Sequence, residues 1–153
     1  MEKVLVSACL MGQKVRYDGS DVKEESDAFQ QLVSMYDVVA FCPEVAGGLP
    51  IPRVPAEIVG GTSSDVLAGK AKVLSKDGVD VTDAFVKGAQ KTLQLCLEQG
   101  ITQAFLTEKS PSCGSSQVYN GAFSGTKIIG QGITTALLRQ NGITVHNQHQ
   151  VNL

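Results

Sequence analysis

Short apolar runs alternate with longer amphipathic stretches along this chain. The apolar runs are rich in Val, Leu, Ile and Phe and lack polar alternation, which is typical of strands buried on both faces. They cover Lys3–Ser7, Asp37–Phe41, Gln103–Leu106 and Ile143–His146. Strands that alternate with helices predict a largely parallel sheet, so we expect an α/β fold, a three-layer Rossmann-like sandwich.

Three stretches have the periodicity of amphipathic helices. They run from about Glu24 to Met35, from about Val81 to Gln99, and from Thr134 to Gln140. The second is the clearest, because its small and apolar residues recur on one helical face. Asp80 is its expected N-cap and Gly100 its expected terminator.

The segments between these elements predict less regular structure. Val45 to Ala56 contains several prolines and glycines and is expected to be an ordered loop. Glu57–Val59 and Lys72–Leu74 are expected to be short strands of a hairpin-like excursion. Without repeats or low-complexity segments, residues 1–153 are expected to form a single domain.

Composition narrows the class of function. The chain has 153 residues, of which 42% are hydrophobic and 18% charged, with a formal net charge of −2. This weak negative charge argues against general nucleic-acid binding and against a membrane-surface protein. No apolar run reaches transmembrane length. The first residues enter a strand without the layout of a signal peptide, so we expect a cytoplasmic protein with a small-molecule ligand.

Four scattered cysteines are the most informative residues. In a reducing compartment they favour metal binding or catalysis over disulfides. Cys96 falls on the buried face of its predicted helix and is expected to be a small core residue. Cys9, Cys42 and Cys113 instead follow the carboxyl ends of three predicted strands. Those ends share one edge of a parallel sheet, so the three thiols could form one site.

Two kinds of centre fit three converging thiolates, since thiolates select zinc or iron–sulfur clusters. Zinc in a structural site requires four ligands, and His146 could be the fourth. A four-iron cluster held by only three cysteines would leave one iron open to a substrate. The residue pattern alone leaves both alternatives open.

Polar residues beside these cysteines are candidates for chemistry. Glu44 follows Cys42 closely and is either a solvated carboxylate or a general acid/base. Ser110 and Ser112 either cap their loop or polarise substrate and water. Lys109 and Arg53 are either surface charges or anchors for an anionic ligand.

Five motif blocks occur in order over nearly the whole chain. They are Val6-Ser7-Ala8-Cys9-Leu10, Arg16-Tyr17-Asp18-Gly19, Cys42-Pro43-Glu44-Val45 with Gly47-Gly48-Leu49-Pro50, Arg53-x-Pro55-Ala56-Glu57, and Ser110-Pro111-Ser112-Cys113-Gly114. Together these blocks resemble a family of small bacterial proteins first grouped as a domain of unknown function, some of which are thiouracil desulfidases.

The resemblance implies a cofactor and a reaction. The cofactor would be a [4Fe-4S] cluster held by Cys9, Cys42 and Cys113, with the fourth iron free. The reaction would remove sulfur from a thiolated nucleobase such as 2-thiouracil and release hydrosulfide, with Glu44 and Ser110 in the catalytic positions. The competing expectation is a non-catalytic zinc-binding or small-molecule-binding domain that uses the same cysteines.

Overall fold

A parallel four-stranded sheet forms the centre of the molecule. The computed structural model describes residues 1–20, 23–108 and 110–147. In spatial order the strands are β2 (Asp37–Phe41), β1 (Lys3–Ser7), β5 (Gln103–Leu106) and β8 (Thr144–Asn147). Each neighbouring pair is parallel, as the alternation of strands and helices predicts.

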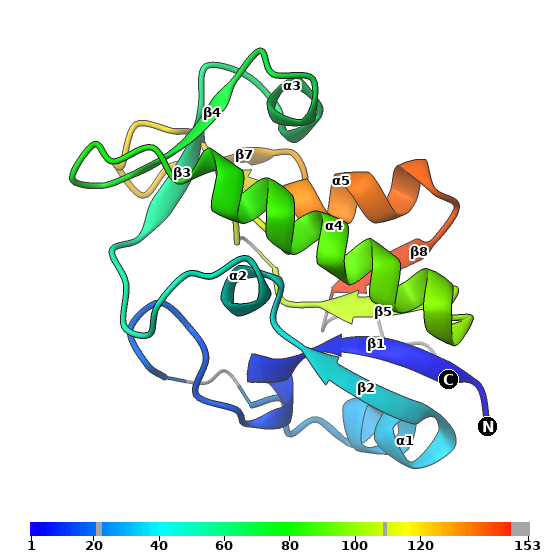
Figure 1. The fold of residues 1–153 in the computed structure, drawn as a ribbon. Coiled ribbons are helices and arrows are strands. Elements are labelled where there is room, and N and C mark those ends of the chain that lie inside the picture. The colour runs from blue at the N-terminus through cyan, green and yellow to red at the C-terminus, as the bar shows by residue number, and fades with distance from the viewer. Residues whose placement is uncertain (21–22, 109, 148–153) are drawn as a thin grey trace.

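Helices cover both faces of this sheet, which confirms the predicted three layers (Figure 1). Helix α1 (Asp27–Met35) lies on one face, and α4 (Thr82–Gln99) and α5 (Ile133–Gln140) lie on the other. β1 is buried on both sides because every residue of its Val4–Val6 core is apolar. Val4 and Val6 pack with α1, whereas Leu5 packs toward α4 and α5.

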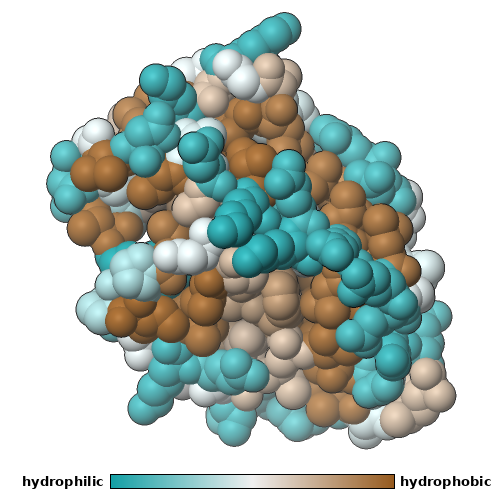
Figure 2. Space-filling model, viewed as in Figure 1, coloured by the Kyte–Doolittle hydropathy of each residue, from teal (hydrophilic) through white to brown (hydrophobic). Residues whose placement is uncertain are grey.

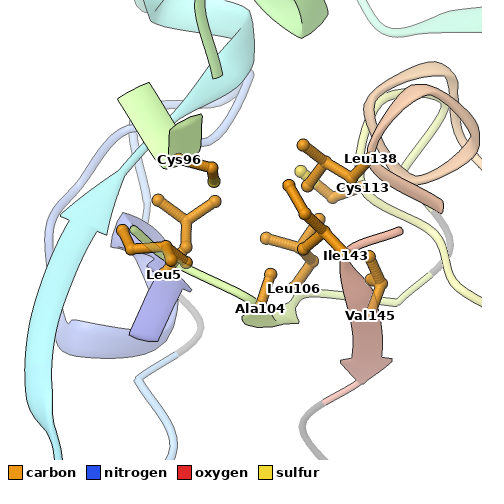
Figure 3. Close-up of a cluster of buried hydrophobic side chains, with 9 residues drawn as sticks. Leu5, Cys96, Ala104, Leu106, Cys113, Leu138, Ile143 and Val145 are labelled. Atoms are coloured by element: carbon orange, nitrogen blue, oxygen red, sulfur yellow. The ribbon is translucent and has the colours of Figure 1, made fainter. Parts of the chain in front are cut away.

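The core cluster on the α4 and α5 face contains two of the four cysteines (Figure 3). Cys96 comes from α4 and packs against Leu5 from β1, as expected for a small core residue. Cys113 comes from the loop after β5 and lies at the Leu138 side of the cluster. Of the two cysteines on this face of the sheet, Cys96 is a core residue, whereas Cys113 lies in the loop that follows the carboxyl end of β5.

The expected hairpin-like excursion is a β–α–β unit. β3 (Ala56–Val59) and β4 (Lys72–Ser75) pair antiparallel and enclose a short helix, α3 (Ser63–Leu67). The Thr62 hydroxyl and the Asp65 carboxylate form a reciprocal capping box that starts α3. The unit packs on α4 and α5 through a separate apolar cluster that includes Val73 and Phe85.

Local hydrogen bonds move several element boundaries from their predicted places. α1 begins at Asp27 because the Ser26 hydroxyl accepts the Phe29 N–H. Val81, not Asp80, is the N-cap residue of α4, although the Asp80 carboxylate still accepts from the backbone N–H and the hydroxyl of Thr82 at the start of the helix. Gly100 ends α4 in the left-handed conformation, as predicted.

Four short elements complete the described chain. η1 (Ala8–Met11) is a 3-10 helix, α2 (Pro43–Ala46) follows β2, and β6 (Gln117–Tyr119) pairs antiparallel with β7 (Lys127–Ile129). The irregular loop expected from Val45 onward therefore begins two residues later, because Val45 and Ala46 belong to α2. Across the described residues, no helix combines the length and apolar character needed to cross a membrane.

α2 and α4 touch backbone to backbone at two glycines. A Cβ atom on Gly88 of α4 would overlap the carbonyl oxygen of Pro43, and one on Gly47 would overlap that of Ala84. Only residues without a side chain allow this approach. Because α2 carries Glu44, the contact determines how far this carboxylate stands from the sheet.

We predict that Gly88→Ala destabilises the protein by about 1–3 kcal/mol, because the added methyl group overpacks the contact with α2. Helix propensity alone would have the opposite effect, a gain of about 1 kcal/mol for alanine in a helix. Chemical denaturation measures the difference. Lys87→Ala changes the neighbouring exposed residue and should stay within about 0.5 kcal/mol of the parent. A Gly88→Ala variant as stable as the parent would contradict the close contact.

Candidate functional site

A cavity of about 740 Å³ lies at the carboxyl edge of the sheet. Its walls come from η1 and the loop after it, α2, the chain leading into β3, the β3–β4 unit, the loop after β5 and the β6–β7 hairpin. Cys9, Cys42 and Cys113 line this cavity, and Cys96 does not. The predicted convergence of three cysteines is therefore present in the structure.

The cavity rim is partly apolar. In Figure 2, hydrophobic side chains gather on the flank where Figure 1 shows the β3–β4 unit and the chain leading into β3, while polar side chains follow the outer face of α4. Val54 and Val79 are both exposed and both line the cavity. Such an entrance suits a ligand that has apolar surface.

Strand pairing brings the three cysteines together. β1 pairs in parallel with β2 through Ser7 and Phe41, and with β5 through Val6 and Phe105. Cys9 follows β1 within η1, Cys42 follows β2 as the N-cap residue of α2, and Cys113 lies in the turn after β5. All three are free thiols, and Cys9 and Cys113 are buried.

Burial and mutual repulsion keep these thiols protonated in the absence of a bound cation. The pKa of Cys9 is raised to about 11, mainly by burial and then by the charge of Cys42, while Arg16 opposes the shift. The pKa of Cys113 is raised well above its usual value, first by burial and then by Glu44, Cys42 and Cys9. Burial also raises the pKa of Cys42.

The same electrostatics separate Cys96 from the group. Burial alone raises the pKa of Cys96 to about 11, with no contribution from another cysteine. Thiols that affect one another's ionisation lie close together, and as thiolates they need a nearby cation to compensate burial. Three soft donors that share one cavity fit the ligand set of an iron–sulfur cluster.

Glu44 and Ser110 form the polar pair beside the thiols. The Ser110 hydroxyl donates to Glu44 Oε1 at 3.0 Å. The Ser110 hydroxyl oxygen in turn accepts the backbone N–H groups of Ser112 at 3.1 Å and Cys113 at 3.2 Å. These two acceptor contacts orient the hydroxyl hydrogen toward Glu44. The contacts also tie the Cys113 loop to α2, across the cavity.

Arg53 is neither a surface charge nor a free anion anchor. Its side chain is 7% exposed and that of Glu44 14%, and the two form an ion pair through Glu44 Oε2. The guanidinium also donates to the carbonyl oxygens of Val15 at 3.3 Å and Pro50 at 3.1 Å. Arg53 therefore holds the second oxygen of Glu44. Lys109, the other candidate anchor for an anionic ligand, lies outside the described residues.

The Ser112 side chain does not reach the cavity. It is 1% exposed, and its hydroxyl lies 2.7 Å from the Thr134 hydroxyl at the start of α5. Its side chain also forms a hydrogen bond that lowers the pKa of Cys113, against the larger effect of burial. Ser112 thus supports Cys113 from behind, whereas only Ser110 of the two candidate serines lines the cavity.

His146 also lies away from the cysteines. Its ring stacks on that of Phe105 with a centroid separation of 5.1 Å, and Phe105 packs on the α1 face of the sheet. His146 is not among the residues that line the cavity. No three His, Cys, Asp or Glu side chains in the described ranges are spaced to hold a single metal ion. The zinc hypothesis therefore lacks its expected fourth ligand.

Glu108 organises the site, although no motif in the sequence indicates a role for it. Its Oε1 accepts the backbone N–H groups of Ser115, Ser116 and Gln117 at 2.9–3.1 Å. Its Oε2 accepts from Asn147 at 2.8 Å. This carboxylate closes the loop that contains Cys113 onto the sheet edge. The only sequence signal was its place in the polar stretch after β5.

Comparison with known proteins gives three consistent matches. Residues 4–150 match the model of a family described as 2-thiouracil desulfurase. A Bacillus subtilis (strain 168) protein, described as uncharacterized protein YbbK, is 47% identical over 149 residues, which is 97% of each chain. A solved structure described as the [4Fe-4S]-dependent thiouracil desulfidase TudS is 49% identical with a TM-score of 0.88, and the match covers 99% of this chain and 93% of that one.

We predict that Arg53→Met destabilises the protein by about 3 kcal/mol, because it leaves the Glu44 carboxylate enclosed without its cation. Thermal and denaturant unfolding measure this loss. Lys72→Met is the matched control, since it removes the cation of the Lys72–Asp80 pair, whose side chains are 69% and 50% exposed. An exposed pair contributes at most about 1 kcal/mol. Equal effects of the two substitutions would show that the Glu44–Arg53 pair is solvated.

Proposed function

The chain belongs to the 2-thiouracil desulfurase family, and on this premise we propose that it removes sulfur from a thiolated nucleobase and releases hydrosulfide. Cys9, Cys42 and Cys113 would hold the [4Fe-4S] cluster that this reaction requires. The observation that carries the proposal is the meeting of three thiols with the Glu44–Ser110 pair in one cavity.

The reaction exchanges a carbon–sulfur bond for a carbon–oxygen bond without a net change of oxidation state. Water adds to the ring carbon, the sulfur leaves as hydrosulfide, and no electron acceptor is consumed. A bound cluster with three protein ligands supplies an open iron, a Lewis acid that suits a soft thiocarbonyl sulfur. The remaining work is proton transfer and positioning, which falls to residues of the chain.

Glu44 is the residue that we assign to proton transfer. Its Oε1 faces the hydroxyl of Ser110, and its Oε2 is held by Arg53. A carboxylate fixed at both oxygens keeps one orientation toward the cavity, as a general base for the attacking water requires. Ser110 would orient this base through the hydrogen bond that its hydroxyl donates to Glu44 Oε1. Ser112, buried against Thr134, would act only by placing Cys113.

We place the activity in the cytoplasm on chemical grounds. All four cysteines are free thiols, which is the state favoured by a reducing compartment. The substrate would be a small thiolated nucleobase, because the net charge of −2 offers little attraction to a polyanion.

We predict that Cys9→Ser, Cys42→Ser and Cys113→Ser each abolish cluster loading, because each removes one of only three thiolate ligands. The measurements are iron and acid-labile sulfide after anaerobic reconstitution, together with the visible spectrum. Cys96→Ser is the matched control and should load like the parent. Full loading of any of the three variants would remove that cysteine from the site. Zinc in place of iron in the parent would favour the non-catalytic alternative.

We predict that Glu44→Gln keeps the cluster but lowers hydrosulfide release from 2-thiouracil by about 100-fold or more, the usual contribution of a general base. Iron content and the rate of hydrosulfide release are measured on the same preparation. Glu98→Gln changes an exposed carboxylate on α4 and should leave turnover unchanged. Turnover within about tenfold of the parent in Glu44→Gln would exclude Glu44 as the base.

A further inference from the structure

The loop between β6 and β7 holds an aromatic residue in a costly backbone conformation. Within the described ranges, Phe123 is the only non-glycine residue with a positive φ, at 54°. This left-handed conformation costs a non-glycine residue about 1–2 kcal/mol. Phe123 lines the cavity, as does Tyr119 at the end of β6. Strain of this kind persists only where surrounding contacts enforce it.

A carboxylate from β3 enforces the loop conformation. Glu57 is buried, and its Oε1 accepts the backbone N–H groups of Gly121 at 2.8 Å and Phe123 at 3.3 Å. Gly121 lies so close to β3 that a Cβ atom would stand 2.5 Å from the carbonyl oxygen of Ile58. The loop is therefore docked on β3, and the docking presents Phe123 to the cavity.

Polar contacts within the loop support the same geometry. The Asn120 side chain accepts the N–H of Ala122 at 2.9 Å, and the backbone N–H of Asn120 donates to Thr126 at 3.0 Å. Neither contact involves the Phe123 ring. Phe123 is thus held at the cavity wall by the backbone contacts of its loop, and it is not part of an apolar core cluster.

We propose that Phe123 stacks on the pyrimidine ring of the substrate, and that Glu57 is the positioning residue that holds Phe123 there. The inference rests on the proposed function and adds a substrate-positioning contact to it. A pyrimidine presents a flat π-face, and base–aromatic stacking contributes to binding irrespective of ring substituents. The thiols and Glu44 would then act at the ring edge while Phe123 covers its face.

The first test is Phe123→Ala in the cluster-loaded enzyme with 2-thiouracil. Loss of a base–aromatic stack should raise KM by about 5- to 150-fold while kcat changes less than about threefold. Ile129→Ala in the same hairpin is the control, since Ile129 is 94% exposed and does not line the cavity. A parent enzyme without turnover would refute the proposed function. A parent with turnover and a Phe123→Ala variant with a KM change below fivefold would refute the stacking role alone.

A second test does not depend on turnover. The chain contains no tryptophan, so Phe123→Trp introduces a single tryptophan at the cavity, which can be excited selectively over the three tyrosines. Uracil, the product of 2-thiouracil desulfuration, should quench this fluorescence in a saturable titration, because it stacks without being consumed. Ile129→Trp should show no saturable change. Quenching equal at both positions, or absent at Phe123→Trp, would overturn the proposal.

The third test concerns Glu57. Glu57→Ala should raise KM as Phe123→Ala does, whereas Glu57→Gln, which retains an acceptor oxygen, should restore KM to within about threefold of the parent. The double variant Phe123→Ala with Glu57→Ala should have the KM of Phe123→Ala alone, since both act through one contact. Additive effects, or a Glu57→Gln variant as impaired as Glu57→Ala, would show that Glu57 has only a structural role.

Discussion

Parallel pairing of β1 with β2 on one side and β5 on the other is the constraint on which the site depends. It brings three segments that are far apart in sequence to one sheet edge, each ending in a cysteine-bearing turn. The thiols are then close enough to raise one another's pKa in a buried setting. A site of this kind holds thiolates only together with a cation, so the fold and the cofactor are thermodynamically linked.

Side-chain hydrogen bonds, rather than helices or strands, fix the chain around the cysteines of the cavity. The loop after β5 has little helix or strand, yet Glu108 binds three consecutive N–H groups of it and Ser110 binds two more. Arg53 fixes α2 to the chain near Val15 through Glu44 and a carbonyl oxygen. Glu44, Arg53, Glu108 and Ser110, which all line the cavity, are therefore engaged with the protein itself.

Sequence periodicity predicted the elements whose burial creates a pattern. The four sheet strands, the long α4 and the core position of Cys96 follow from apolar spacing. α2 and α3 were missed because they are short, and their starts depend on Pro43 and the Thr62 capping box rather than on periodicity.

Contacts between distant segments explain the remaining differences. The Glu44–Arg53 pair, the clamp at Glu108 and the burial of Ser112 arise only after folding and leave no local signal. His146 is different. Side chains alternate between the two faces of a strand, so His146 points to the face of the sheet opposite to that of its neighbour Val145, which packs toward α5. Its exclusion from the cysteine edge was therefore already implicit in the two-residue period of β8.

The glycine contact between α2 and α4 has a consequence for how the protein can vary. Gly47 and Gly88 each face a backbone carbonyl of the other helix, so neither position can be relieved by shrinking a side chain at its partner. A larger residue at either position is accommodated only by moving a whole helix. Substitution of either glycine by a residue with a side chain is thus disfavoured whatever residue stands at the other position. A directed-evolution library aimed at new substrates should therefore leave both glycines unchanged.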